Sequence, residues 1–300
     1  MFNADLLDDL AREKAVLFLG AGVSASAKTS TGGKIADWNT FLAALCNDVP
    51  EPIASQVRAL IQAKDYLLAG EILQSALADG WESKITEHFG QKATPSALHA
   101  SLIALSQRII LTTNFDKLLE VAFEKMDIRD THYPTVINKV EDDVFRALKD
   151  HNRKYIVKIH GTVDDPSSRV LSRSEYIRLA FGNSYYSSFL ENLLLNYTFL
   201  FVGFSMDDPA IMSLMEMYSL RYPKARPHYI FAGGPIPENI IEINKRLRKL
   251  IYIVYDSTDN HAALPGLITD IAIASDARRR EIFAEHQATA SPKEGTTEGL

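Results

Sequence analysis

The sequence predicts an α/β protein with a mostly parallel, doubly wound sheet and a helical module inserted after its first strand. Short apolar runs alternate with amphipathic segments of helical period, which is typical of a parallel sheet covered by helices on both faces. Several runs end in glycine or polar residues, and ligands of open α/β sheets bind at the carboxyl ends of strands. Between residues 38 and 105 the pattern is helical only, a stretch of about seventy residues that is too long for one crossover connection. Together these observations predict a Rossmann-like fold.

The apolar runs place the expected strands at residues 16–19, 108–111, 155–159, 199–202, 228–232 and 250–255. Glycines follow the first and fourth of these strands, Asn114 follows the second, and His160 follows the third. Because the carboxyl ends of parallel strands meet at one edge of a sheet, we expect these residues to converge there.

The helical periodicity places helices at residues 38–47, 52–63, 65–78, 81–89 and 96–105 in the inserted module, and at 117–125, 184–196, 208–218 and 276–286 elsewhere. We expect the module, about residues 38–105, to cover the ligand cleft of a single domain spanning residues 1–287. Residues 288–300 are polar and have almost no apolar side chains, which predicts a disordered tail.

Composition and charge exclude several classes of protein. The net charge of −6 argues against a general nucleic-acid binder, and no apolar run is long enough for a membrane span. The single cysteine, Cys46, rules out an intrachain disulfide and a cysteine-based zinc site. The N-terminus carries acidic residues and lacks the pattern of a secretory signal, so we expect a cytoplasmic protein.

The first strand runs into a tight turn formed by Gly20, Ala21 and Gly22, with Ser24 close behind. Two glycines let the backbone approach a pyrophosphate, and a following helix N-terminus would offer N–H donors. A plain structural turn is the alternative, because two glycines at this spacing are weak evidence by themselves. The polar stretch 26–34 that follows could fold over a ligand or remain a solvated loop.

Polar side chains also follow the second and third strands. Asn114 and Asp116 are separated by Phe115, so both polar groups can point into a cleft while the phenyl ring anchors the loop. The alternative is helix capping, which Asn and Asp favour. His160 comes at the tip of an apolar strand beside Gly161, where an imidazole suits general base catalysis.

Four motifs occur in a specific order: Gly20-Ala-Gly22-Val-Ser24, Thr113-Asn114-Phe-Asp116, His160-Gly161 and Gly203-Phe-Ser205. In this order and spacing they resemble the sirtuin superfamily, and in particular the bacterial sirtuin-like proteins of anti-phage defence. The segments Leu171-Ser-Arg-Ser-Glu-Tyr176 and Phe201-Val-Gly-Phe-Ser-Met-Asp-Asp-Pro209 add to the resemblance.

The resemblance implies that the chain binds NAD as a substrate and needs no metal. It assigns Asn114 to the nicotinamide ribose and a water molecule, and His160 to the role of base. It also implies a set of residues that contact other parts of NAD: Gly20, Ala21, Gly22 and Ser24 at the phosphates, Thr113 beside Asn114, Asp116 near the nicotinamide, Gly203 and Ser205 at the adenosine half, and Asp37 in a mobile cofactor loop.

Protein-deacylating sirtuins carry a small domain with four zinc-binding cysteines, which a chain with one cysteine cannot build. The sequence therefore favours an NAD hydrolase that releases nicotinamide and ADP-ribose and depletes NAD in anti-phage defence. A protein deacylase or an ADP-ribosyltransferase, and a non-catalytic NAD- or ADP-ribose-binding subunit of a defence complex, are the alternatives.

Unregulated NAD hydrolysis would harm the cell, so we expect the activity to be gated. The resemblance suggests a homo-oligomer, or a partner such as a HerA-type hexameric ATPase or a short Argonaute-type protein. Direct contact with nucleic acid or membrane is not expected.

Overall fold

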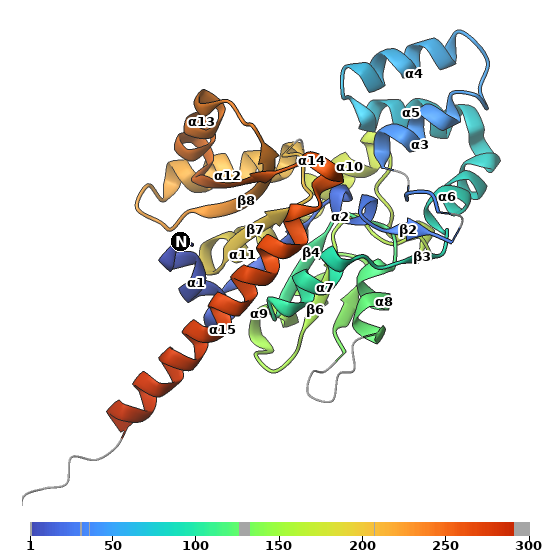
Figure 1. Cartoon of the computed structure of the whole chain (residues 1–300). Helices are drawn as coiled ribbons and strands as arrows, with labels where there is room; N and C mark the ends of the chain where they lie inside the picture. The colour runs from blue at the N-terminus through green and yellow to red at the C-terminus, as the bar shows by residue number, and fades with distance from the viewer. Residues whose placement is uncertain (1, 31, 36, 126–132, 207, 291–300) are drawn as a thin grey trace, which may run out of the picture.

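A computed structural model describes residues 2–30, 32–35, 37–125, 133–206 and 208–290 (Figure 1). Its main sheet has seven strands in the order β5-β6-β4-β1-β7-β8-β9, and every neighbouring pair is parallel. The strands are β1 (Ala15–Leu19), β4 (Ile109–Thr112), β5 (Thr135–Ile137), β6 (Tyr155–Lys158), β7 (Thr198–Val202), β8 (His228–Gly234) and β9 (Leu250–Asp256). A small antiparallel pair, β2 (Lys28–Thr29) and β3 (Ala93–Thr94), lies apart from it. The predicted Rossmann-like fold is confirmed.

The order of the strands places the topological switch point at β1, because strands are added on one side of β1 and then on the other. From β1 the chain passes to β4 on one side, and it later returns to β7 on the other side of β1. Leu19 pairs with both Thr112 and Val202, and Thr112 pairs with Lys158, so β1, β4, β6 and β7 end level with one another. Ligands of open α/β sheets bind at such a switch point, outside the carboxyl ends of the strands.

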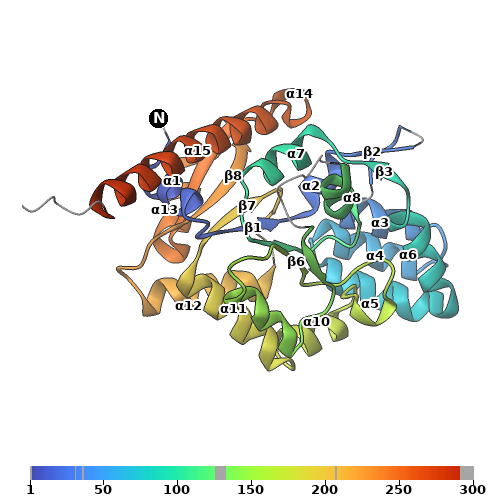
Figure 2. The same ribbon diagram turned by 90° about the horizontal axis from the view of Figure 1, so that it is seen from below.

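Helices cover both faces of the sheet, as Figure 2 shows from below. On one face Phe18, Leu111 and Val157 pack in a core with residues of α9 (Arg146–Lys149), α10 (Arg173–Ala180), α11 (Ser184–Asn196) and α12 (Pro209–Arg221). On the other face Leu17, Ile110 and Ile156 pack with residues of α1 (Ala4–Ala11), α7 (Ala97–Ala104), α8 (Leu118–Lys125) and α15 (Ala263–Ala290). Neighbouring residues of a strand point to opposite faces, which explains why these strands are apolar throughout.

The inserted module consists of α3 (Trp38–Leu45), α4 (Ile53–Gln62), α5 (Tyr66–Leu77), a 3₁₀ turn η1 (Ala78–Gly80) and α6 (Trp81–Phe89). Figure 1 shows it beyond one end of the sheet, near α2 (Ala21–Ala25) and α10. Its own core includes Phe41, Leu73 and Trp81. The expected fifth helix of the module forms as α7, but it packs on the sheet, because its Leu98 and Leu102 belong to the core of that face.

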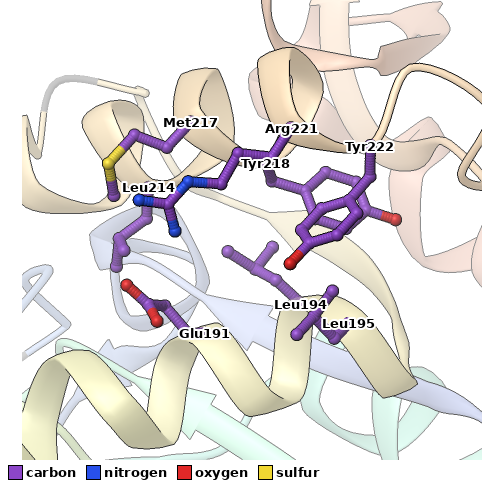
Figure 3. A pocket seen from close by; sticks show the side chains of 8 residues that line it. All are labelled: Glu191, Leu194, Leu195, Leu214, Met217, Tyr218, Arg221 and Tyr222. Carbon is purple, nitrogen blue, oxygen red and sulfur yellow. The ribbon is translucent and has the colours of Figure 1, made fainter.

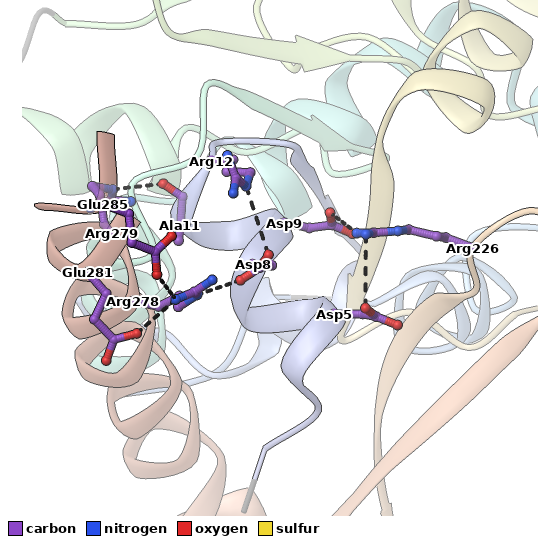
Figure 4. Close-up of polar contacts among 10 residues, drawn as sticks. All are labelled: Asp5, Asp8, Asp9, Ala11, Arg12, Arg226, Arg278, Arg279, Glu281 and Glu285. Atoms are coloured by element: carbon purple, nitrogen blue, oxygen red, sulfur yellow. Dashed lines mark hydrogen bonds and ion pairs between the residues drawn. The ribbon is translucent and has the colours of Figure 1, made fainter. Parts of the chain in front are cut away.

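Two terminal helices are tied together by charge (Figure 4). Asp8 of α1 accepts a hydrogen bond from Arg278 of α15 at 2.6 Å. Asp9 accepts hydrogen bonds from Arg226 at 2.5 Å and from the hydroxyl of Thr198 at 2.6 Å. These contacts attach α1 to both α15 and the amino end of β7, although the sequence pattern did not predict α1.

Other elements also differ from the expectations. The strand β5 and the helices α10, α13 (Glu238–Arg248) and α14 (Thr258–His261) were not predicted. The helix expected at 276–286 is the end of α15, which is 28 residues long. This helix continues three residues into the segment expected to be disordered, and the remainder of that segment, 291–300, lies outside the described residues. In the parts of the chain that the structure describes, no helix is both long and apolar enough to cross a membrane.

Candidate active site

The loops that follow β4 and β6 run side by side at the carboxyl edge of the sheet. The amide of Ile159 donates to the carbonyl of Thr112 at 2.9 Å, and the amide of Val163 donates to the carbonyl of Phe115 at 2.9 Å. These two hydrogen bonds lie on either side of Asn114 in one loop and of His160 in the other. The predicted convergence of these two strand ends is therefore present in the backbone.

Asn114 joins this pair of loops to the glycine turn after β1. Its Nδ2 donates to the carbonyl of Gly20 at 2.9 Å, and its own amide donates to Oγ1 of Thr112 at 3.0 Å. The amide of Thr113 donates to the carbonyl of Leu19 at 3.3 Å. The carboxamide is thus held by its nitrogen at the switch point, between β1 and β4.

Asp116 combines the two roles that the sequence left open. Its Oδ1 accepts from the amide of Leu118 at 2.9 Å, which is the interaction of a residue that caps α8. Its Oδ2 accepts from the hydroxyl of Ser24 at 2.5 Å. Because Ser24 lies in α2, directly after the glycine turn, the same carboxylate also fastens the loop after β4 to the segment after β1.

The glycines after β1 and β7 allow two backbones to pack directly on each other. The amides of Gly20 and Gly22 donate to the carbonyls of Val202 and Gly203, at 3.0 and 2.9 Å. A Cβ on Gly20 would lie 2.4 Å from the Gly203 carbonyl oxygen, and Gly203 itself has a φ of +60°. Close packing of the loops therefore accounts for these glycines, and the N–H groups of Gly20 and Gly22 already have partners. Ala21 is the residue between them.

Two other predicted ligand residues, Ser205 and Asp37, are exposed. Ser205 lies in the loop after β7. The side chain of Asp37 caps α3 by accepting from the amide of Thr40 at 2.7 Å.

His160 is directed toward a residue for which the sequence assigned no function. Its Nε2 lies 3.4 Å from Oδ2 of Asp208, in the loop that leads from β7 to α12. The imidazole stands edge-on to the ring of Tyr176, with centroids 6.1 Å apart. Among the described residues, no hydrogen bond joins the side chains of His160 and Asn114, so their proximity rests on the backbone contacts of their loops.

Asp208 is held firmly and stays ionised. Its Oδ1 accepts from the hydroxyl of Tyr176 at 2.6 Å and from the amides of Ala210 and Ile211 at 3.0 and 3.1 Å. Burial tends to raise the pKa of Asp208, but the nearby imidazole of His160 and the hydrogen bonds from Tyr176 and the backbone outweigh it and hold the pKa below its ordinary value. The signal in the sequence was the pair Asp208-Pro209, which is typical of a helix start and so indicated only a cap.

Lys158 is a second residue that sequence reasoning missed. It is 1% exposed, and its Nζ lies 2.8 Å from Oε1 of Glu120 and donates to the carbonyl of Asp116 at 2.5 Å. A lysine inside the apolar run of β6 was the available signal, because a buried ammonium requires a partner. It fastens the end of the strand that carries His160 to the loop that carries Asn114 and Asp116.

The helical module packs on the same two loops. Phe115 is 3% exposed and inserts into the core of the module, with its ring centroid 5.5 Å from that of Phe89 and 6.3 Å from that of Trp38. Arg173, in the segment after His160, pairs with Asp65 of the module at 3.0 Å. The phenyl ring thus anchors the loop as expected, and it does so in the module.

An apolar groove between α11 and α12 lies elsewhere on the molecule (Figure 3). It is lined by residues of the two helices and by Tyr222, which follows α12: Glu191, Leu194, Leu195, Leu214, Met217, Tyr218, Arg221 and Tyr222. Because α12 starts at the carboxyl end of β7 and runs back along the sheet, this groove lies away from the carboxyl ends of the strands. None of the predicted site residues lines it. Within the described ranges, no group of three or more His, Cys, Asp or Glu side chains could hold a metal ion.

Comparison with known proteins supports the resemblance read from the motifs. Residues 108–252 match the model of the SIR2-like domain. The NAD(+) hydrolase ThsA of Bacillus cereus (strain MSX-D12) is 27% identical over 238 residues, which cover 76% of this chain and 45% of that protein. ThsA of Enterococcus faecium is 32% identical over 164 residues, 53% of this chain and 32% of that protein.

Defense-associated sirtuin 2 of Bacillus subtilis is 23% identical over 207 residues, which cover 68% of this chain and 19% of that protein. The chain therefore matches less than half the length of each of these relatives. Among solved structures, cytosolic 5′-nucleotidase IIIB bound to cytidine aligns over 93% of this chain at 11% identity with a TM-score of 0.38, which is too low to carry an argument.

Proposed function

We propose that this chain, which is similar to sirtuin-like proteins, is an NAD hydrolase that releases nicotinamide and ADP-ribose. One observation carries the proposal. The loops after β1, β4, β6 and β7 start at the same level of the sheet, and they bring the glycine turn, Asn114 and His160 to the switch point. Proteins that are similar to this chain are named NAD(+) hydrolases.

The reaction needs a correctly oriented water molecule as the nucleophile and an acceptor for one proton. Water attacks C1′ of the nicotinamide ribose while the bond from C1′ to the nicotinamide nitrogen breaks, and the electron pair of that bond leaves with neutral nicotinamide. Asn114 orients the ribose and the water, which supplies the entropic part of catalysis. His160 accepts the proton of the attacking water and later returns it to solvent.

NAD enters this proposal as the substrate, held by the residues expected from the sequence. Ala21, Ser24 and Thr113 lie at the loops that meet at the switch point, and Asp116 bonds to Ser24 there. Since the amides of Gly20 and Gly22 are used by the loop after β7, we expect side chains to supply more of the contacts to NAD than the sequence suggested.

The direct test is to incubate the purified chain with NAD and to quantify nicotinamide and ADP-ribose by chromatography, at low and at high protein concentration. Replacement of the base in His160→Ala should lower kcat by about 10²- to 10⁴-fold. Asn114→Ala should also lower kcat, because the ribose and the water lose their orientation. A folded His160→Ala variant that releases nicotinamide at the unchanged rate would refute the assignment of the base.

Regulation and setting are part of the same proposal. We expect an NAD-depleting activity in anti-phage defence, in the cytoplasm, gated by formation of a homo-oligomer or by a partner such as a HerA-type ATPase or a short Argonaute-type protein. Hydrolysis that rises more steeply than protein concentration would support gating by self-assembly. Turnover strictly proportional to concentration, with no effect of added partner, would refute gating.

A further inference from the structure

Asp208 and His160 form a buried pair at the carboxyl edge of the sheet. The exposed fractions are 8% for Asp208 and 7% for His160, and their closest atoms, Oδ2 and Nε2, are 3.4 Å apart. The Nε2 atom is buried, and among the residues that the structure describes it has no hydrogen-bond partner of good geometry. A buried ring nitrogen that faces a carboxylate at this distance is poised to donate to it.

Helix capping does not explain both oxygens of this carboxylate. The three donors that hold Asp208, the hydroxyl of Tyr176 and the amides of Ala210 and Ile211, all bond to Oδ1. Oδ2 is left to face the imidazole. One oxygen thus fixes the carboxylate in place, and the other is directed at the residue to which the base function was assigned.

We propose that Asp208 is a positioning residue for His160, whose Nε2–H it accepts so that Nδ1 is left as the proton acceptor. The inference rests on the function proposed for His160. In the reaction, Nδ1 takes the proton of the water that attacks C1′, and the carboxylate stabilises the imidazolium that results until the proton passes to solvent. A carboxylate that orients a catalytic imidazole in this way also selects its tautomer. Catalytic hydrogen bonds are often long in the absence of substrate, and the separation of 3.4 Å is of this kind.

The central variant is Asp208→Asn. Asparagine caps helices as well as aspartate does, so the substitution keeps the shape and the cap. It removes the charge and replaces the oxygen that faces His160 with an amide nitrogen, which donates and cannot accept. Its control is Asp256→Asn. Asp256 is the last residue of the edge strand β9 and also accepts from a backbone amide, that of Thr258 at 2.9 Å, but it is exposed.

We expect Asp208→Asn to lower kcat for nicotinamide release by at least about tenfold while KM changes by less than about twofold. The double variant Asp208→Asn/His160→Gln should be no slower than His160→Gln alone, because residues that act as a unit are not additive. Asp256→Asn should match the wild type. Losses that multiply in the double variant, or an unchanged kcat in Asp208→Asn, would overturn the proposal.

A second readout does not depend on catalysis. In the full chain labelled with ¹⁵N-histidine, long-range ¹H–¹⁵N spectra report which ring nitrogen of His160 carries the proton. We expect the proton on Nε2 in the wild type, and a changed pair of nitrogen shifts in Asp208→Asn but not in Asp256→Asn. Ring shifts of His160 that are identical in all three proteins would refute the positioning role.

These measurements separate the positioning role of Asp208 from the proposed NAD hydrolase activity. A wild-type chain that never releases nicotinamide under any condition refutes the proposed function, whereas the ring shifts still decide the contact. Tyr176→Phe serves if Asp208→Asn does not fold, since it removes only the hydroxyl that holds Oδ1. It should shift the His160 ring nitrogens in the same direction by a smaller amount, and unchanged shifts would count against the proposal.

Discussion

Lys158 allows a sharp test of how the site is held together. Replacing it with methionine keeps the aliphatic stem and removes an ammonium that is 1% exposed. The carboxylate of Glu120, 8% exposed, would lose its partner at 2.8 Å, and its Oε2 already has none. Breaking a buried ion pair in this way costs about 3–5 kcal/mol. That loss is a large part of the total stability of about 5–15 kcal/mol that is usual for a folded protein.

Unfolding in urea, followed by circular dichroism, measures this loss for Lys158→Met. The control is Lys125→Met at an exposed position of α8, which should change the free energy of unfolding by less than about 0.5 kcal/mol. The double variant Lys158→Met/Glu120→Leu should be more stable than Lys158→Met, because no buried charge is then left unpaired. The reasoning is refuted by a loss below about 1 kcal/mol for Lys158→Met, or by a double variant that is less stable than the single one.

Two further predictions concern the loops and the buried histidines. Gly203→Ala should lower the free energy of unfolding by more than about 2 kcal/mol, because its φ is +60° and the new Cβ would lie 2.6 Å from the amide nitrogen of Val23. Gly266→Ala, where a Cβ meets open space in a helix, should be neutral or stabilising in the same urea assay, and equal losses at both positions would contradict the packing argument. Burial lowers the pKa of His99 to about 4 and that of His228 to about 3. Both pKa values lie below the value of a histidine in the unfolded chain, about 6.5. The contribution of each histidine to the free energy of unfolding is therefore complete above about pH 6.5 and falls as the pH drops. At pH 4 the loss is about 3 kcal/mol for each histidine. Urea midpoints that stay constant between those pH values would show that these rings are not buried as neutral groups.

Elements with long or strongly periodic patterns were predictable from the sequence. Six of the seven parallel strands and the helices of the module form within a few residues of their expected positions. The seventh strand, β5, has only three residues and lies at the edge of the sheet, so it leaves no apolar run to detect. The helix α10 has a polar sequence with two buried residues, Tyr176 and Ala180, and its pattern is correspondingly weak.

The residues of the candidate site also fall into those that the sequence identified and those that it did not. Asn114 and His160 could be identified because each follows a buried strand, and the identity of a residue at a strand end is a local property of the chain. The partner of His160, Asp208, and the buried pair of Lys158 and Glu120 could not be identified from the sequence. Asp208 and Glu120 look like ordinary helix residues there, and only the fold brings them near His160 and Lys158.

The sequence alone determined the class of fold, the order of the motifs and the residues at the ends of the strands, because periodicity and turn residues act over short stretches of chain. The tertiary structure decided which loops are in contact. The glycines that follow β1 and β7 pack on each other, Phe115 inserts into the module, and Asp208 faces His160. Such contacts depend on which strands become neighbours in the sheet. The order of the strands depends on apolar burial and strand pairing over the whole chain, so no single segment determines it.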